Sequence, residues 1–184
     1  ADKWRTIQQR CQTTDDEPRW LVALISDTGM RLSEAAGLAR EDIVLDADIP
    51  HVIIRPHPWR RLKTKGSERT LPLVGCSLWA AERAVEASQH SPYLFPRYCN
   101  DKGCKANSAS AALNKWLKQT SGDGYVMHSF RHSMRDRLRA LNCPSEMIDQ
   151  IGGWSKRSVG EGYGVGYTIS QLRGWILNLE RTVC

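Results

Sequence analysis

The stretch that decides the fold is residues 127–163, which read MHSFRHSMRDRLRALNCPSEMIDQIGGWSKRSVGEGY. Its first part predicts a helix over about residues 129–141, because apolar side chains recur there at steps of three and four positions. A second, shorter helix is expected from Pro144 to Ile151, since proline suits the first turn of a helix. The glycines at 152–153 then end this helix and let the backbone bend.

Four side chains of this stretch carry chemistry. His128 and Arg131 stand three positions apart and therefore project from one face of the predicted helix. Trp154 follows the glycines, and Tyr163 comes nine residues later. An imidazole, a guanidinium, an indole N–H and a phenol brought together suit phosphate chemistry. Taken singly, each is also compatible with an ordinary role on the surface or in the core, so the interpretation depends on partners elsewhere in the chain.

The first partner is an arginine that follows a well-marked helix. Residues 15–18, Asp-Asp-Glu-Pro, predict a helix start, and the helix is expected over residues 18–27 with Gly29 as its end. Arg31 precedes a short helix for which Ser33 is the expected cap. Because the helix dipole disfavours a cation there, Arg31 indicates an anion held jointly by its guanidinium and nearby amides. A plain surface arginine is the alternative.

Residues 43–73 change to a strand pattern and include a basic turn. Short strands of an antiparallel meander are expected at residues 43–45, 51–55, 59–62 and 69–73. The turn at residues 63–67 joins the last two strands. Four cations lie in this turn or just before it, namely Arg60, Arg61, Lys63 and Lys65. The cluster is compatible with a solvated basic loop and with contacts to phosphate groups.

The rest of the chain has a mainly helical pattern. Helices are predicted at about residues 76–88, 109–120 and 170–181, the second capped by Asn107 or Ser108 and the third by Ser170. Residues 97–105 are expected to form a loop. Residues 1–14 are expected to be a lead-in, either a helix remnant or a linker. The predicted fold class is therefore α+β, a mostly helical domain with a small antiparallel β-meander.

Composition narrows the choice of function. The 184 residues carry a formal charge of +6 and a pI of about 9.1, which fits one domain and favours a polyanionic partner. Cys99 and Cys104 have no second pair to complete a zinc set, so free thiols of a reducing cytoplasm are expected. His128 and His132 lack the glutamate of a His-Glu-x-x-His motif, so no metal site is predicted. No apolar run reaches membrane-spanning length, and no signal peptide is evident. Because the chain starts at Ala1 without Met, we expect a trimmed fragment.

Four segments, in their order along the chain, resemble the catalytic domain of the tyrosine recombinases, the phage integrase family. They are TGMRLSEAAGL, LKTKGSERTLPL, HSFRH and IGGWSKRSVGEGY. The resemblance covers about residues 15–182, and the ordered set is far more specific than any single motif. It implies the DNA breaking-rejoining catalytic fold over residues 15–184. It also implies a fragment without the N-terminal core-binding domain that family members usually carry.

The resemblance implies roles for individual residues. The implied catalytic groups are Arg31, Lys63, His128, Arg131, Trp154 and the nucleophile Tyr163. Lys65 is the alternative lysine, because the basic turn offers two. Tyr167 is a rival nucleophile, which the nine-residue step from Trp154 disfavours. Glu34 corresponds to an acidic residue that orients the first arginine, and contacts to DNA are expected from Arg60, Arg61 and Lys65.

The implied function is site-specific cutting and rejoining of double-stranded DNA by an enzyme of a phage or mobile element. In the family, the arginines clamp the scissile phosphate and the tyrosine forms a covalent 3′-phosphotyrosine, so neither a metal nor another cofactor is expected. We expect a tetramer on DNA and a monomer without it, in the bacterial cytoplasm at the nucleoid, away from membranes. The alternatives are a type IB topoisomerase-like enzyme and a basic DNA-binding module without catalysis.

The predicted last helix carries a narrow apolar stripe, made of Leu172, Trp175, Ile176 and Leu179. Following the resemblance, we expect this stripe to dock on a neighbouring protomer in a cyclic assembly. Packing against its own domain is the alternative.

Overall fold

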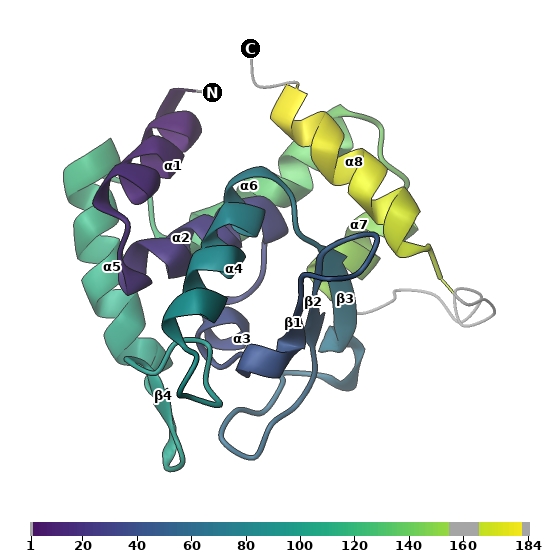
Figure 1. Ribbon diagram of the computed structural model, residues 1–184. Coiled ribbons are helices and arrows are strands. Elements are labelled where there is room, and N and C mark those ends of the chain that lie inside the picture. The colour runs from purple at the N-terminus through teal and green to yellow at the C-terminus, as the bar shows by residue number, and fades with distance from the viewer. Residues whose placement is uncertain (1, 155–165, 182–184) are drawn as a thin grey trace.

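Helices dominate the computed structural model, which describes residues 2–154 and 166–181 (Figure 1). The α-helices are α1 (Asp2–Thr14), α2 (Glu17–Thr28), α3 (Leu32–Ala36), α4 (Gly75–Ala87), α5 (Ala106–Ser121), α6 (Met127–Ala140), α7 (Ser145–Gly152) and α8 (Ile169–Arg181). The strands are β1 (Ile43–Val44), β2 (His51–Ile54), β3 (Arg69–Pro72), β4 (Cys99–Asn100) and β5 (Gly103–Cys104), and two short 3-10 turns are η1 (Arg40–Asp42) and η2 (Lys65–Ser67). This arrangement confirms the predicted α+β class.

Helix α2 lies at the centre of the core. Asp16 caps its start, because a carboxylate oxygen accepts a hydrogen bond from the Arg19 backbone N–H at 3.1 Å. Gly29 ends it in the left-handed conformation, at φ 62°, and donates its N–H to the Ile25 carbonyl. Helices α1, α4 and α6 pack around α2, so most of its side chains are buried. The helix predicted at residues 18–27 is confirmed.

A three-stranded antiparallel sheet has the order β1-β2-β3. Ile43 pairs with Val52, and Ile53 pairs with Thr70. The strand predicted at residues 59–62 is wrong, since these residues make only an isolated bridge between His57 and Arg60. Prolines at positions 56 and 58 offer no backbone N–H for a ladder, which explains the interruption. The link between β2 and β3 is consequently a long loop, and it ends in η2.

The segment before α5 also differs from expectation. Residues 97–105, predicted as a loop, contain the two-stranded hairpin β4–β5. Helix α5 starts at Ala106, with Lys105 at the N-cap position, so the caps predicted at Asn107 and Ser108 are wrong. Strands of two residues are too short to show a periodic pattern, and the turn residues dominate that part of the sequence.

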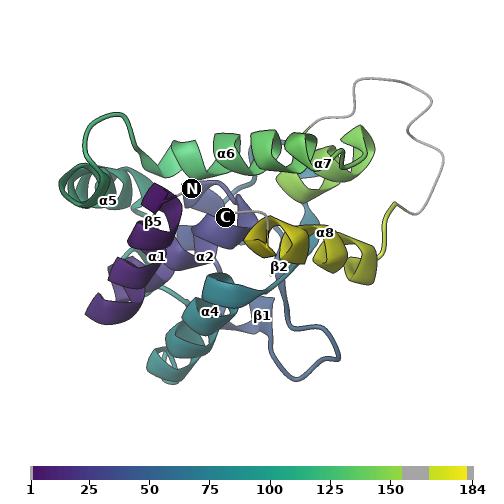
Figure 2. The same ribbon diagram turned by 90° about the horizontal axis from the view of Figure 1, so that it is seen from above.

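Helices α6 and α7 confirm the prediction for the central stretch. Figure 2 shows α6 running across one face of the molecule, with α5 near one end and α7 near the other. Buried Phe130, Met134 and Leu138 lie at four-residue steps on the inner face of α6. Gly153 ends α7 in the left-handed conformation, at φ 60°.

Helix α8 packs on its own chain. Leu172, Ile176 and Leu179 are buried in the core, and the helix lies against β3 and α6. The expectation that this stripe is left for a neighbouring protomer is therefore wrong, because the sheet and α6 already cover it. The start of α8 is fastened by Thr168 rather than by Ser170: the Thr168 hydroxyl accepts a hydrogen bond from the Gln171 backbone N–H at 3.3 Å.

Helix α1 occupies the lead-in segment. Trp4, Ile7 and Cys11 of this helix are buried in the same core as the residues of α2. The Trp4 ring meets Phe130 of α6 edge-on, with the ring centroids 5.3 Å apart. Over residues 2–154 and 166–181, no helix combines the length and apolarity that crossing a membrane requires.

Candidate active site

Arg31 occupies the N-cap position of α3 and is tied to that helix by its own glutamate. The Arg31 backbone N–H donates to Glu34 Oε2 at 3.0 Å, and Arg31 Nη1 donates to Glu34 Oε1 at 2.6 Å. A side chain three residues into a helix that reaches back to the N-cap N–H is one half of a capping box. The predicted cap at Ser33 is thus wrong, and Arg31 lies just before the helix as expected.

Glu34 is the buried centre of this ion-pair network. Its side chain is 2% exposed and also accepts a hydrogen bond from Arg69 Nη2 at 2.9 Å. Burial alone would raise the pKa of Glu34, but the charge and hydrogen bonds of Arg69 and Arg31 outweigh it and hold the pKa below its ordinary value. The carboxylate therefore stays ionised and fixes two guanidinium groups in place.

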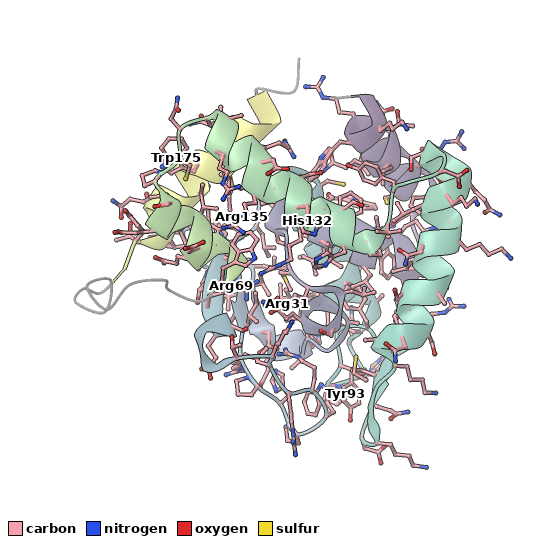
Figure 3. All side chains as sticks on the ribbon, turned by 180° about the vertical axis from the view of Figure 1, so that it is seen from behind. Arg31, Arg69, Tyr93, His132, Arg135 and Trp175 are labelled. Atoms are coloured by element: carbon pink, nitrogen blue, oxygen red, sulfur yellow. The ribbon has the colours of Figure 1, made fainter. Side chains whose placement is uncertain are left out.

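Arg69, at the start of β3, is a site residue that the sequence interpretation missed. Besides Glu34, its guanidinium donates to the Ser67 carbonyl at 2.7 Å and to the Ile151 carbonyl at 2.9 Å. Arg69 therefore joins α3 and the end of α7 to the loop between β2 and β3, residues 55–68, which we call the basic loop (Figure 3). The only sequence signal was a cation inside a predicted strand, which by itself is also typical of a solvent-facing strand position.

Arg131 projects from α6 into the same region and is 3% exposed. Its Nη1 donates to the Gly29 carbonyl at 3.1 Å, and its guanidinium lies 4.3 Å from the centre of the Trp154 ring. Its Nη2 is buried and has no hydrogen-bond partner among the described residues. Burial, followed by repulsion from Arg31 and Arg69, lowers the pKa of Arg131 to about 10. The group remains charged at neutral pH, with a donor available for an anion.

His128 lies one turn before Arg131 and is exposed at the surface. Partial burial lowers its pKa from the ordinary 6.5, and the charges of His132, Arg131, Arg31 and Lys63 lower it further. The charges of three other predicted catalytic residues, Arg131, Arg31 and Lys63, therefore act on His128. Its imidazole is neutral at pH 7 and is able to accept a proton.

Trp154 follows α7 and is half-buried beneath two arginines. The guanidinium of Arg135 lies 4.9 Å from the ring centre, in addition to that of Arg131. The ring also covers Gly152 so closely that a Cβ atom there would come within 1.8 Å of ring carbons. A glycine at position 152 is thus required for Trp154 to support the face of Arg131.

The basic loop brings Lys63 to the edge of this cluster. Lys63 is exposed, and the backbone of Lys65 begins η2. The loop is anchored by Ser67, whose buried hydroxyl accepts a hydrogen bond from Arg31 Nη1 at 3.3 Å and lies 3.0 Å from the Thr64 hydroxyl. These contacts connect the loop that carries both lysines to the N-terminus of α3.

The other two loop cations differ from each other in exposure. Arg61 is exposed, whereas Arg60 is only 4% exposed. A Cβ atom on Gly37 would lie 2.5 Å from the Arg60 side chain, which shows how tightly Arg60 is enclosed. Contact between Arg60 and DNA would require this side chain to leave its position.

The predicted nucleophile Tyr163 lies outside the described residues. Its rival Tyr167 is described, and the Gln150 side chain exchanges hydrogen bonds of 2.9 Å with its backbone N–H and carbonyl. The Tyr167 hydroxyl donates to Glu146 at 3.5 Å, and its pKa is raised by burial and by that carboxylate. A raised pKa makes a phenol a poorer nucleophile.

The described residues contain no cluster of three or more His, Cys, Asp or Glu side chains that could hold a metal ion. The side chains whose charges act on His128 are His132, Arg131, Arg31 and Lys63. Figure 3 shows Arg31 and Arg69 close together, with His132 and Arg135 on the neighbouring helix α6.

Comparison with known proteins finds one family model and two solved structures that are similar to this chain. The sequence model of the Phage integrase family matches residues 1–164. A structure of the XerH site-specific recombinase bound to a palindromic difH substrate, a post-cleavage complex, is 16% identical with a TM-score of 0.61, covering 98% of this chain and 49% of that one. A structure of the Tn1549 transposon integrase with transposon right end DNA is 17% identical with a TM-score of 0.56, covering 90% of this chain and 59% of that one. No curated protein matches.

The two structural likenesses establish the fold. The chain spans about half of the XerH chain and somewhat more of the Tn1549 integrase chain, 49% and 59% respectively. Both similarities extend over nearly all of the helices and the sheet described above. The predicted DNA breaking-rejoining fold is confirmed.

Proposed function

Because this chain belongs to the phage integrase family, we propose that it is the catalytic domain of a site-specific tyrosine recombinase. Its substrate is double-stranded DNA, which it cuts and rejoins through a covalent 3′-phosphotyrosine. Both structural neighbours were determined in complex with DNA, which supports this choice of partner.

The observation that carries the proposal is the pair of Arg131 and Arg31. Arg131 has a buried Nη2 without a hydrogen-bond partner among the described residues, and its pKa is lowered first by burial and then by the charge of Arg31. Planar guanidinium groups match the two non-bridging oxygens of a phosphodiester. In this role the two arginines bind the scissile phosphate and stabilise the charge that grows during in-line displacement.

Attack begins at Tyr163. A phenol has an ordinary pKa of about 10, so it needs a base before it attacks an anionic phosphodiester. His128 is the proposed base, since its lowered pKa keeps the imidazole neutral at pH 7. The phenol oxygen forms a bond to phosphorus while the bond from phosphorus to the 5′ oxygen breaks, leaving the 3′ end attached to the protein.

The departing 5′ oxygen takes a proton from a lysine of the basic loop. Lys63 is the proposed donor, because it is exposed and its charge acts on His128; Lys65 is the alternative. A mobile ammonium suits this step better than a guanidinium, which does not release its proton. Rejoining reverses the sequence: a 5′ hydroxyl attacks the phosphotyrosine, and the tyrosine leaves with a proton from His128.

The remaining site residues hold these groups in place. Glu34 orients Arg31, and Trp154 supports the guanidinium of Arg131 with its ring face. The Trp154 indole N–H is the proposed additional donor to a phosphate oxygen. Arg61 and Lys65 are the proposed contacts to the DNA backbone, in line with the formal charge of +6.

The complete reaction needs four protomers on two duplexes. We propose a tetramer on DNA and a monomer without it, acting in the bacterial cytoplasm at the nucleoid as part of a phage or mobile element. Closed, symmetric assembly is the usual arrangement for identical subunits.

A nicked suicide substrate tests the proposal. Loss of the short fragment beside the nick prevents religation, so the chain should accumulate as a protease-sensitive adduct with DNA. Tyr163→Phe should abolish the adduct, and Tyr167→Phe should retain it as a matched control. An adduct that survives Tyr163→Phe contradicts the assignment of the nucleophile.

The same assay separates the alternative functions. A DNA-binding module without catalysis would shift DNA in a salt-dependent manner and form no adduct with any variant. A type IB topoisomerase-like enzyme would form the adduct and would also relax plasmid that lacks any specific site. The proposed recombinase should form the adduct only on DNA that contains its own site, and it should not relax plasmid that lacks this site.

A further inference from the structure

A second set of reactive side chains lies in the hairpin β4–β5. Cys99 and Cys104 are direct partners across the two strands, and both are free thiols. The backbone N–H of Lys105 donates to the Tyr98 carbonyl at 2.7 Å, so the neighbouring Cys99–Cys104 pair occupies a non-hydrogen-bonded position of the ladder. Such pairs hold their Cα atoms about 4.5 Å apart, which lies within the range that a disulfide bond spans.

The two thiols are chemically different. The side-chain interaction between the two thiols lowers the pKa of Cys104 and raises that of Cys99. The charge of Arg60 and the backbone N–H of Ala106, at the N-terminus of α5, lower the pKa of Cys104 further, against the opposing effect of burial. Cys104 is partly exposed, whereas Cys99 is 3% exposed.

Arg60 supplies an independent observation at the same place. Its guanidinium is buried, and none of its three nitrogens has a hydrogen-bond partner within the described part of the chain. Burial lowers its pKa, and the charges of Asp42, Glu34 and the two thiols oppose that effect. Both carboxylates already accept hydrogen bonds from other groups. A buried cation is costly without an anion, and the Cys104 thiol is the remaining group near Arg60 that becomes an anion when it loses its proton.

We propose that Cys99 and Cys104 form a redox-active dithiol site whose substrate is the disulfide bond of a small thiol compound. Cys104 is the thiolate nucleophile, Arg60 is its counterion, and Cys99 is the thiol that closes the protein disulfide. This site is separate from the DNA chemistry proposed above and needs neither DNA nor Tyr163.

The reaction balances in two exchanges. The Cys104 thiolate attacks one sulfur of the small disulfide RS–SR, forms a mixed disulfide and releases RS⁻. Cys99 then gives its proton to RS⁻ or to water and attacks the Cys104 sulfur, which releases the second RS⁻. Two electrons pass from the dithiol to RS–SR, which leaves as one RSH, protonated by Cys99, and one RS⁻, which takes a proton from water, and the protein keeps one disulfide bond.

The chain contains its own reference thiols. Burial raises the pKa of Cys11 to about 12 and that of Cys143 to about 11. Thiols of this kind react slowly, because the thiolate is the nucleophile. In the full folded chain carrying Cys184→Ser, a short pulse of iodoacetamide at pH 7 should label Cys104 first and leave Cys11 and Cys143 unlabelled.

Oxidised glutathione is the probe for the second exchange. Trypsin cuts after Lys102, between the two cysteines, so a Cys99–Cys104 disulfide holds the two resulting peptides together until a reductant is added. The Cys184→Ser chain should give this linked pair. With Cys99→Ser in addition, the reaction should stop with one glutathione on Cys104.

Arg60 variants test the counterion. Arg60→Lys keeps the positive charge and should leave the pH profile of Cys104 alkylation close to that of the parent chain. Arg60→Met removes the charge at similar size and should move the midpoint to higher pH and slow labelling at pH 7 several-fold. Circular dichroism identifies a variant that fails to fold, and in that case the alkylation profile of the parent chain decides.

Three results would overturn the proposal. One is labelling of Cys104 no faster than that of Cys11 in the folded parent chain. Another is an alkylation midpoint at or above the ordinary thiol pKa of 9.0. The third is glutathione oxidation that leaves the two tryptic peptides unlinked.

Discussion

The Arg131 guanidinium is held on one side by the Gly29 carbonyl and on another by the Trp154 ring, which leaves its buried Nη2 to act on an anion. We predict that Arg131→Ala and Arg31→Ala each slow cleavage of a suicide substrate by about 10²–10³-fold, as when one oxyanion donor is removed. DNA affinity should fall far less, since many cations share that work. Single-turnover cleavage and gel-shift titration measure the two effects.

The matched control for this prediction is Arg139→Ala. Arg139 lies on the same helix as Arg131 but its side chain is 58% exposed, so this variant should cleave nearly like the parent. Near-parental cleavage by Arg131→Ala would show that this residue does not bind the scissile phosphate.

A change of leaving group shows which lysine, Lys63 or Lys65, gives a proton to the departing 5′ oxygen. Lys63→Ala should slow cleavage of ordinary DNA by about 10²–10⁴-fold, the range of general acid catalysis. A 5′-bridging phosphorothiolate should restore the rate, because sulfur leaves without a proton. Rescue of Lys65→Ala, with Lys63→Ala unaffected on ordinary DNA, would instead assign the proton to Lys65.

At the scale of elements, Glu34 joins α3 to β3 through Arg69. Because its pKa is lowered in the folded state, this carboxylate stabilises the fold above its ordinary pKa of 4.5, and the contribution is lost as the pH falls through the lower folded value. Glu34→Gln should therefore lower the free energy of unfolding by about 3 kcal/mol at pH 7, since it leaves buried Arg69 without its anion.

Urea denaturation at pH 7 and at pH 4 measures this effect. The difference between Glu34→Gln and the parent should shrink at the lower pH. Glu41→Gln, whose carboxylate is 75% exposed beside Arg55, should change the stability little at either pH. A difference for Glu34→Gln that stays constant with pH would contradict the ion-pair account.

Elements with strong local signals could be predicted from the sequence. The capping residue before α2 and the apolar periodicity of α6 are encoded within single turns, so these helices are found where expected. The expected strand at residues 59–62 failed because prolines 56 and 58 remove ladder donors, an effect that outweighs the favourable side chains. The hairpin β4–β5 is too short to show a period.

The site could be predicted only where side-chain chemistry is tied to a motif. Arg31, His128 and Arg131 could be proposed together because their motifs stand in a distinctive order, and in the structure partial burial and the charges of Arg131 and Arg31 lower the pKa of His128. Arg69 was missed because its role depends on contacts with α3 and α7, which lie far away in sequence. The burial of Arg60, next to three other cations in the sequence, could likewise not be predicted, since burial is a property of the fold.

At the scale of the whole molecule, α8 contributes buried side chains to the core and therefore to the stability of the domain. We predict that Ile176→Ala lowers the free energy of unfolding by about 2–5 kcal/mol, because this buried side chain packs against the core. Ser170→Ala, an exposed position on the same helix, should change it little. A truncation after Tyr167 should lose cooperative unfolding, and a truncated chain as stable as the parent would contradict the observed packing of α8.

The central claim is that Tyr163 forms a covalent bond to the 3′ phosphate of a cleaved strand. Trapping the adduct on a suicide substrate, digesting it with protease and sequencing the DNA-linked peptide by mass spectrometry tests this most directly. The account predicts a single linkage, at Tyr163, to the 3′ end of the DNA. A linkage at Tyr167, a linkage to a 5′ end, or a folded chain that binds its site without any adduct would contradict it.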